Sequence, residues 1–288
     1  MAAPAIPAGS PPDIFSVMVE ELFIRLRIES MLRNLCSATS VLMVSSRPRS
    51  ICESAELILP IALVIRLAVK HGYEYLWIMD DDTIPEQTAL EELIKADKLL
   101  NGNYGFLSSY VKWIDNSPCE MNVPKLDFNW GKDIAQQFDN YMIRLESASF
   151  VSMFVKSDVV KKVGLPIKEF FIWADDVEYS KRISRQYPCY FVYKSQVVHE
   201  MGSNKSATII DTDNDRLGRF ELLYRNRYYV AKHGAKRDRI LFWIEIKNTI
   251  RDIQKSNCKN KGKRIRIVLK SVWKGLSFEP KIEYISKK

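Results

Sequence analysis

Short apolar runs alternate with amphipathic stretches along most of this chain. The run Tyr75–Met79 is apolar throughout and short, which predicts a strand buried on both faces at the centre of a mostly parallel sheet. Residues 87–100 and 176–186 instead repeat their apolar positions with the period of a helix, and Lys181, Arg182 and Arg185 are expected to face water. This alternation predicts an α/β fold with helices on both sides of a central sheet.

The same patterns, with turn residues as boundaries, give the remaining elements. Residues 116–137 contain Pro118, Pro124 and Gly131 and are expected to form a loop region. Residues 2–12 are rich in Ala and Pro and are expected to be a flexible lead. The longest apolar run, residues 57–69, is interrupted by Arg66 and is shorter than the ~20 residues that a membrane span needs. The expected helices cover 24–35, 54–70, 87–100, 158–163, 176–186, 216–232 and 237–255, and the expected strands cover 41–45, 74–79, 105–111, 149–155, 190–193 and 197–198.

Three consecutive aspartates follow the central strand at Asp80, Asp81 and Asp82. Folds of this class bind ligands at the carboxyl ends of their strands. Adjacent carboxylates repel one another and resist desolvation, so their position at the mouth of the core favours a bound cation. The alternative is a solvated acidic turn that caps the helix beginning near Pro85.

A second acidic pair, Asp175 and Asp176, stands directly behind an aromatic cluster that includes Trp173. The pair occupies the expected start of the helix at 176–186, where capping of the helix explains one of the two. An aromatic wall beside a carboxylate also suits a sugar ring and a hydroxyl that must lose its proton. A carboxylate in a partly dry pocket gains proton affinity and can act as a general base.

The chain has three histidines, and one of them stands apart. His71 and His233 each precede a glycine, as residues at helix ends do. His199 instead ends an expected strand and precedes a loop that contains Gly202.

Composition and charge narrow the class of protein. With 288 residues, of which 47% are hydrophobic, and a mean hydropathy of −0.18, the chain can form one sizeable domain with an appended segment. Five scattered cysteines without a Cys-x-x-Cys pair indicate a reducing, cytoplasmic compartment. Residues 255–288 hold eleven basic and two acidic residues, a balance of +9, while the whole chain carries +8. The basicity therefore lies in a C-terminal tail, and no nucleic-acid groove is expected in the main domain.

In that tail, apolar residues such as Leu269 and Trp273 are interleaved with lysines and arginines. This composition suits peripheral contact with an anionic membrane. The alternative is a basic helix that packs by its apolar side on the main domain.

Five segments together resemble the inverting glycosyltransferases of family 2, which have the GT-A fold, and look closest to its galactofuranosyl and rhamnosyl transferases. The resemblance covers about residues 67–250, somewhat under two thirds of the chain. The matching segments are 77–85, 111–113, 173–179, 198–200 and 224–229. Ala174 is an insertion between Trp173 and Asp175 relative to the family pattern.

This resemblance implies a Rossmann-like GT-A domain at 13–254 and roles for named residues. Asp80, Asp82 and His199 would bind a divalent metal, Mn2+ or Mg2+, that bridges the diphosphate of a UDP- or dTDP-sugar donor. An imidazole ligand favours Mn2+. Asp176 would be the catalytic base, with Asp175 beside it, and one displacement would invert the anomeric carbon. Further contacts with substrate would come from Asp81, Trp113, Trp173 and Glu178.

The acceptor implied by the resemblance is a cell-surface glycan or its lipid-linked precursor, for which residues 116–137 could line a site. Residues 13–66 depart from the family: no glycine lies between Gly9 and Gly72, and nothing in 41–60 supplies the aspartate that grips the nucleobase. Two other readings stay open. A phosphotransferase could use the Asp triplet for Mg2+, although no Walker loop is found. A catalytically impaired relative, or a basic membrane- or nucleic-acid-binding protein, would show no metal-dependent sugar transfer.

Overall fold

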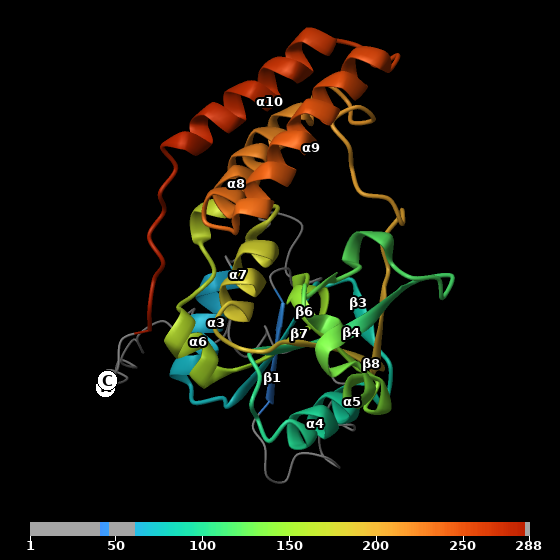
Figure 1. Cartoon of the computed structure of the whole chain (residues 1–288), viewed down its shortest axis with the longest axis vertical. Helices are drawn as coiled ribbons and strands as arrows, with labels where there is room; N and C mark the ends of the chain where they lie inside the picture. The colour runs from blue at the N-terminus through green and yellow to red at the C-terminus, as the bar shows by residue number, and fades with distance from the viewer. Residues whose placement is uncertain (1–40, 46–60, 286–288) are drawn as a thin grey trace, which may run out of the picture.

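The computed structural model describes residues 41–45 and 61–285, and these form a mixed α/β fold with one central sheet (Figure 1). The strands follow the spatial order β1-β2-β7-β4-β8-β6-β5, and β3 pairs with β8 beside this path. Their bounds are β1 Val41–Ser45, β2 Tyr75–Met79, β3 Thr83–Pro85, β4 Phe106–Trp113, β5 Lys125–Leu126, β6 Met142–Ser147, β7 Met153–Lys156 and β8 Tyr190–His199.

The strand directions correct one expectation. The pairs β1–β2 and β4–β8 are parallel, whereas β2–β7, β4–β7, β3–β8, β5–β6 and β6–β8 are antiparallel. The sheet is therefore mixed rather than mostly parallel. The apolar run of β2 reports burial on both faces, and burial does not fix the direction of the neighbouring strands.

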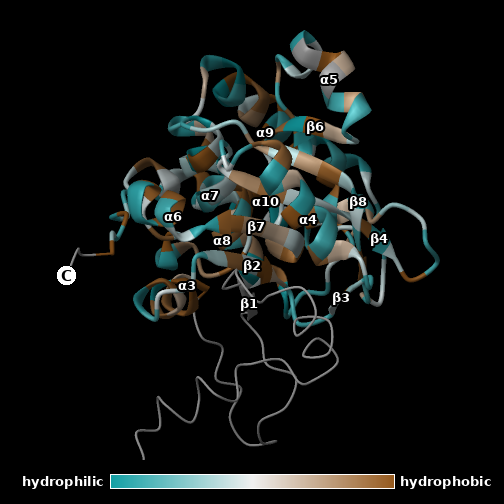
Figure 2. Ribbon diagram, turned by 90° about the horizontal axis from the view of Figure 1, so that it is seen from below, coloured by the Kyte–Doolittle hydropathy of each residue, from teal (hydrophilic) through white to brown (hydrophobic). Residues whose placement is uncertain are grey.

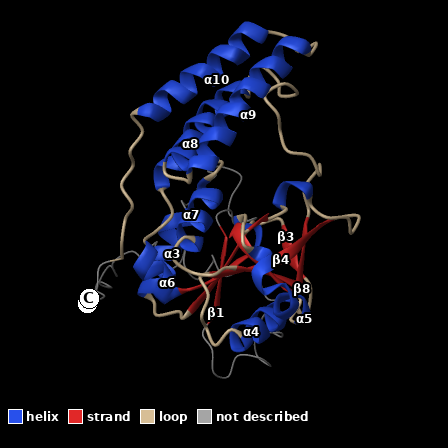
Figure 3. Ribbon diagram, in the orientation of Figure 1, coloured by secondary structure: helices blue, strands red, loops and turns tan. Residues whose placement is uncertain are grey.

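Helices cover both faces of the sheet, as the ribbon in Figure 3 shows. Side chains alternate along a strand, so Leu76 and Ile78 of β2 pack in the core against α3, α6 and α7, while Trp77 and Met79 pack in the core against α4. Helix α3 is hydrophobic along most of its length (Figure 2). The helices are α3 Ile61–Lys70, α4 Ala89–Leu99, α5 Ile134–Asp139, α6 Ser157–Val163, α7 Asp175–Ser184, α8 Phe220–Lys232, α9 Lys236–Lys255 and α10 Lys261–Leu276.

The last three helices pack together above the sheet as a separate bundle (Figure 1). Phe242 and Ile246 of α9 and Val268 of α10 share a buried cluster with Tyr224 of α8. After α10 the chain returns to the body of the protein, where the backbone N–H of Leu165 donates to the carbonyl of Glu283 at 2.8 Å. The Glu283 carboxylate also pairs with Arg66 and Lys168.

Most expected elements within the described residues are present. Strand 41–45 matches β1, and the expected helices at 87–100, 158–163 and 237–255 match α4, α6 and α9 within two residues at each end. Strands β3, β5 and β6 and helix α5 are additional, and α10 is the basic helix of the second interpretation of the tail, with its apolar side packed against α8 and α9. The expected flexible lead at 2–12, the helix at 24–35 and most of the divergent stretch 13–66 lie outside the described residues. No helix among the described residues is long and apolar enough to cross a bilayer.

Candidate active site

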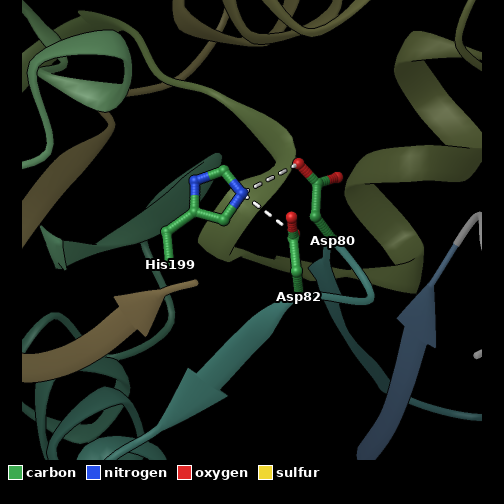
Figure 4. A group of neighbouring side chains, drawn as sticks. All are labelled: Asp80, Asp82 and His199. Carbon is green, nitrogen blue, oxygen red and sulfur yellow. Dashed lines mark hydrogen bonds and ion pairs between the residues drawn. The ribbon is translucent and has the colours of Figure 1, made fainter. Parts of the chain in front are cut away.

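Two turns of backbone bring Asp80, Asp82 and His199 together (Figure 4). Asp80 follows the last residue of β2, and the N–H of Thr83 donates to the Asp80 carbonyl at 3.1 Å in the turn that leads into β3. Strand β3 pairs antiparallel with the end of β8, so that Thr83 is the register partner of His199. This pairing places Asp82 beside a histidine 117 positions away.

The ring of His199 points at both carboxylates. Its Nε2 lies 2.9 Å from Asp82 Oδ1 and 3.9 Å from Asp80 Oδ2. The three ligand atoms of this group all lie within 4.8 Å of one another. The imidazole is 5% exposed, whereas the carboxylates of Asp80 and Asp82 are 41% and 32% exposed, so the cluster is open to solvent on its acidic side.

These residues fit a divalent cation. Two carboxylates and one imidazole form a mixed oxygen and nitrogen donor set, which suits Mn2+ better than Mg2+. The buried ring on one side and the accessible carboxylates on the other leave coordination positions for water or substrate oxygen. The structure thus brings together the three ligands that the sequence predicted.

Asn122 orients the histidine, a role that the sequence did not reveal. His199 Nδ1 lies 2.9 Å from Asn122 Oδ1, an acceptor, so Nδ1 carries the proton and Nε2 faces the carboxylates. The Asn122 amide in turn donates to Ser149 Oγ at 3.1 Å, which fixes the orientation of the amide. Asn122 lies in the stretch expected to be a loop, where neither periodicity nor a motif marks it.

Asp175 and Asp176 form the first turn of α7, behind a backbone turn of unusual conformation. Trp173 has φ +66° and Ala174 has φ +63°, both in the left-handed region that non-glycine residues rarely adopt. Such strained residues cluster at functional sites. The first-turn position gives both carboxylates the favourable field of a helix N-terminus.

The buried amide of Asn226 on α8 holds this strained turn. Its Nδ2 lies 3.0 Å from the carbonyl of Phe170, 3.2 Å from that of Ile172 and 2.9 Å from that of Trp173. Arg225 donates to Asn226 Oδ1 at 2.8 Å and to the Glu169 carbonyl at 2.6 Å. The segment at 224–229, singled out from the sequence by resemblance alone, therefore contacts the backbone that precedes the acidic pair.

The carboxylates of the Asp-Asp-His cluster and those of the pair Asp175 and Asp176 interact electrostatically. Desolvation, together with the charges of Asp175 and Asp80, raises the pKa of Asp176 to about 8. Desolvation also raises the pKa of Asp80 to about 6, and the charges of Asp82 and Asp175 add to this effect while His199 opposes it. The Asp80 carboxylate keeps 41% of its surface, so its desolvation is partial. Desolvation raises the pKa of Asp175 as well. Excess negative charge gathered in this way attracts a cation.

The structure places three further residues that the sequence predicted to contact substrate. Trp113 is the register partner of His199 in β4, and its indole donates to the Met201 carbonyl at 3.0 Å. Asp81 stands between the two ligand aspartates, and its charge contributes to the raised pKa of Asp80. Trp173 stacks at a tilt on Phe220, with ring centroids 5.0 Å apart.

Glu178 is placed differently. Both of its carboxylate oxygens are bonded to Arg182, at 3.0 and 2.8 Å, and Arg182 also donates to the carbonyls of Val163 and Leu165. Glu178 is buried, so this arrangement gives it a structural role instead of the expected contact with substrate.

The expectation that Lys181 and Arg182 face water is wrong. Both are buried, because Lys181 pairs with Glu146 at 2.8 Å and Arg182 pairs with Glu178. Helical periodicity identifies an exposed face only when no further element covers it. Here β6, the start of α9 and the segment after α6 all do so.

A cavity of about 640 Å³ lies beside Trp173, two residues before the acidic pair in the sequence, and neither aspartate of the pair lines it. Trp173 and Phe220 form an aromatic wall, and the segment that follows His199 supplies hydroxyl, carboxylate and ammonium groups. The lining residues are Trp173, Ser203, Lys205, Ser206, Ala207, Thr208, Asp211, Thr212, Asp213, Arg216, Arg219 and Phe220.

Comparisons with known proteins find similarity among solved structures, and not to a protein family or to a curated protein. No protein-family model matches the chain. No curated protein matches it either. Among solved structures, the chain is similar to the crystal structure of GalNAc-T7 with UDP, GalNAc and Mn2+, with a TM-score of 0.46, 10% identity and a match over 75% of the chain. That match covers 42% of GalNAc-T7, so the chain spans less than half of that protein, and a similarity of this extent does not assign an activity.

Proposed function

We propose that this chain is a metal-dependent inverting glycosyltransferase of family 2 with the GT-A fold. It would move a galactofuranosyl- or rhamnosyl-type sugar from a UDP- or dTDP-sugar to a hydroxyl of a glycan or of a lipid-linked precursor. One observation supports this proposal most: the ligand atoms of Asp80, Asp82 and His199, which come from distant parts of the chain, all lie within 4.8 Å of one another.

Asp80, Asp82 and His199 would hold the cation. When bound, a divalent ion supplies Lewis-acid neutralisation of the diphosphate, which makes the nucleoside diphosphate a better leaving group. Asn122 keeps the imidazole in the tautomer whose Nε2 is free to coordinate.

Asp176 would act as the general base. A pKa raised to about 8 gives its carboxylate a stronger affinity for the acceptor proton than an ordinary aspartate has, and a bound cation nearby would lower that value toward neutrality. Asp175 maintains the electronegative environment from the adjacent position in α7.

The cavity beside Trp173 is on the acceptor side of the reaction. In a single displacement the attacking hydroxyl and the leaving diphosphate lie on opposite faces of the anomeric carbon. The base contacts the hydroxyl, and Trp173, which lines the cavity, precedes the acidic pair by two residues, so the cavity would receive the acceptor. An aromatic wall of Trp173 and Phe220 with a rim of polar side chains is suited to a sugar ring.

A cytoplasmic location belongs to the same proposal. Cys119, Cys189 and Cys258 are free thiols among the described residues, as expected in a reducing compartment. A lipid-linked acceptor would also bring the enzyme to a membrane surface.

The decisive experiment is a screen of nucleotide-sugar turnover with Mn2+, in which the parent chain is compared with Asp176→Asn. We expect the variant to lose transfer by a factor of at least about 100, because the base is removed, while Mn2+ affinity measured by calorimetry is retained. Asp139→Asn, an exposed carboxamide substitution on α5, is the matched control and should leave turnover unchanged.

Full turnover by Asp176→Asn would refute the assigned base. Release of inorganic phosphate in place of a nucleoside diphosphate would instead identify a phosphohydrolase. No turnover of any donor by the parent chain, with intact Mn2+ binding, would identify a catalytically impaired relative.

A further inference from the structure

Helix α10 carries an exposed apolar stripe on the side that faces away from the bundle. Leu269 is 53% exposed, Trp273 71% and Leu276 50%. These residues follow one another at intervals of four and three, so they lie on one face of the helix. The opposite face, with Ile267, Val268 and Val272, is buried in the core of the bundle.

Helix α9 exposes a second apolar group in its first half. Ile240 and Trp243 are each 52% exposed, and Leu241 and Ile244 are each 48% exposed. Tyr228 of α8 links the two groups: its ring centroid lies 6.2 Å from that of Trp243, and the same ring packs directly on Gly275 of α10. The start of α9 and the end of α10 therefore lie at the same end of the bundle.

The charge on α10 is of one sign. Helix α10 contains six basic residues and no acidic residue. Arg264 is buried and donates to backbone carbonyls, and Lys270 and Lys274 pair with Glu221. Lys263 and Arg266 are exposed on the same helix and show no ion pair among the described residues.

We propose that the outward face of α9 and α10, formed by Ile240, Trp243, Ile244, Leu269, Trp273 and Leu276, lies on the surface of an anionic lipid bilayer. Indole and leucine side chains partition into the boundary between headgroups and acyl chains, and flanking lysines and arginines are attracted to anionic headgroups. A second copy of the same face is disfavoured, because two sets of cations without acidic partners would repel each other.

This surface goes beyond the proposed transfer reaction and does not depend on it.

Removal of residues 255–288 would not test this inference. It would expose the buried side of the bundle, since Ile267, Val268 and Val272 of α10 pack in its core. Substitution of the exposed stripe alone leaves that core intact.

The test is flotation of the full-length protein with vesicles of phosphatidylcholine alone or of phosphatidylcholine mixed with phosphatidylglycerol. The parent should float with the anionic vesicles and stay at the bottom with the neutral ones, and added salt should weaken the binding. The triple variant Leu269→Ser, Trp273→Ser, Leu276→Ser should partition at least about 10-fold less. Lys263→Glu combined with Arg266→Glu should weaken binding to anionic vesicles only.

A triple variant at exposed apolar positions elsewhere, Leu99→Ser, Phe138→Ser, Tyr193→Ser, is the control and should float as the parent does. Circular dichroism and Mn2+ affinity should be unchanged in all variants. Weaker flotation of a variant would then be due to its altered surface and not to unfolding. Equal flotation of the parent and the stripe variant would overturn the proposal. A parent protein that does not bind anionic vesicles would also overturn the proposal. In that case, self-association in ultracentrifugation or binding of nucleic acid would assign the stripe to a different partner.

Discussion

At the scale of single residues, the site depends on side chains that change the protonation of their neighbours. Asn122 contacts no carboxylate of the Asp-Asp-His cluster, yet its carbonyl oxygen fixes which nitrogen of His199 is free. Besides desolvation, the charges of Asp175 and Asp80 raise the pKa of Asp176, and the charges of Asp82 and Asp175 raise that of Asp80, so neither titrates as an isolated aspartate.

Substitution of Asn122 should weaken the metal site without removing a ligand. We expect Asn122→Ala to reduce Mn2+ affinity by about 10- to 100-fold, because the imidazole loses the partner that orients it. Calorimetric titration of protein stripped with EDTA measures the change. Ser149→Ala removes only the second partner of Asn122 and should have a smaller effect. Unchanged affinity in Asn122→Ala would show that the ring is held by its packing alone.

The raised pKa of Asp176 predicts a pH-dependent stability. The folded protein holds this proton up to about pH 8, whereas the unfolded chain releases it near its usual value of about 3.9. The folded state binds more protons in between, so the free energy of unfolding falls as pH rises from about 4 to about 8 and then levels off.

In metal-free protein, Asp176→Asn should therefore match the melting temperature of the parent near pH 4. It should exceed the parent increasingly as pH rises, by on the order of 5 °C near pH 8. Differential scanning calorimetry in EDTA measures the difference. A gap that is constant with pH would contradict the raised pKa.

Residue types predicted a cation at the aspartate triplet, because carboxylates after a buried strand are a local signal, whereas the choice of Asp80, Asp82 and His199 as ligands rested on the resemblance to a known family. Asn122, Asn226 and the ion pairs of Lys181 were not predictable in this way. Their roles exist only through contacts across the sheet and between helices, which leave no period or spacing in the sequence.

At the scale of elements, α7 and α8 act as one unit around the strained turn. The Asn226 amide on α8 holds three carbonyls of the segment that leads into α7. Strand β3 has only three residues, but its pairing with β8 sets the positions of Asp82 and His199. The sequence predicted most helices and strands because each produces a local pattern of apolar and polar residues. It did not predict β3, β5 or the mixed direction of the sheet, which depend on tertiary pairing.

Asn226→Ala should damage catalysis more than metal binding. The loss of a buried amide leaves carbonyls of the turn unpaired and should cost about 1–3 kcal/mol of stability. We expect kcat to fall at least about 10-fold, because Asp176 loses its position, while Mn2+ affinity stays unchanged. Asn248→Ala, at a half-buried position on α9, is the control. Equal losses of kcat and Mn2+ affinity would point to a general structural defect.

At the scale of the whole molecule, a cation bound by the Asp-Asp-His cluster would couple separate parts of the fold. Its three expected ligands come from the end of β2, the turn before β3 and the end of β8. Mn2+ at about 100 times its dissociation constant should stabilise the folded state by about 2.7 kcal/mol. For a chain of this size that is a rise of roughly 5–10 °C in melting temperature.

Thermal denaturation with Mn2+, followed by EDTA, measures this rise and its reversal. Asp82→Asn should abolish the shift, whereas Asp139→Asn should keep it. A shift of the same size in Asp82→Asn would place the stabilising ion elsewhere on the protein.

The antiparallel pairing of Thr83 with His199 also has a consequence for the order of events during folding. The two positions are far apart along the chain, so closing this contact is entropically costly and is expected late on the folding path. An ion that needs both sides would then be absent from the transition state. It should slow unfolding while leaving the rate of folding almost unchanged, and so act on the lifetime of the native protein.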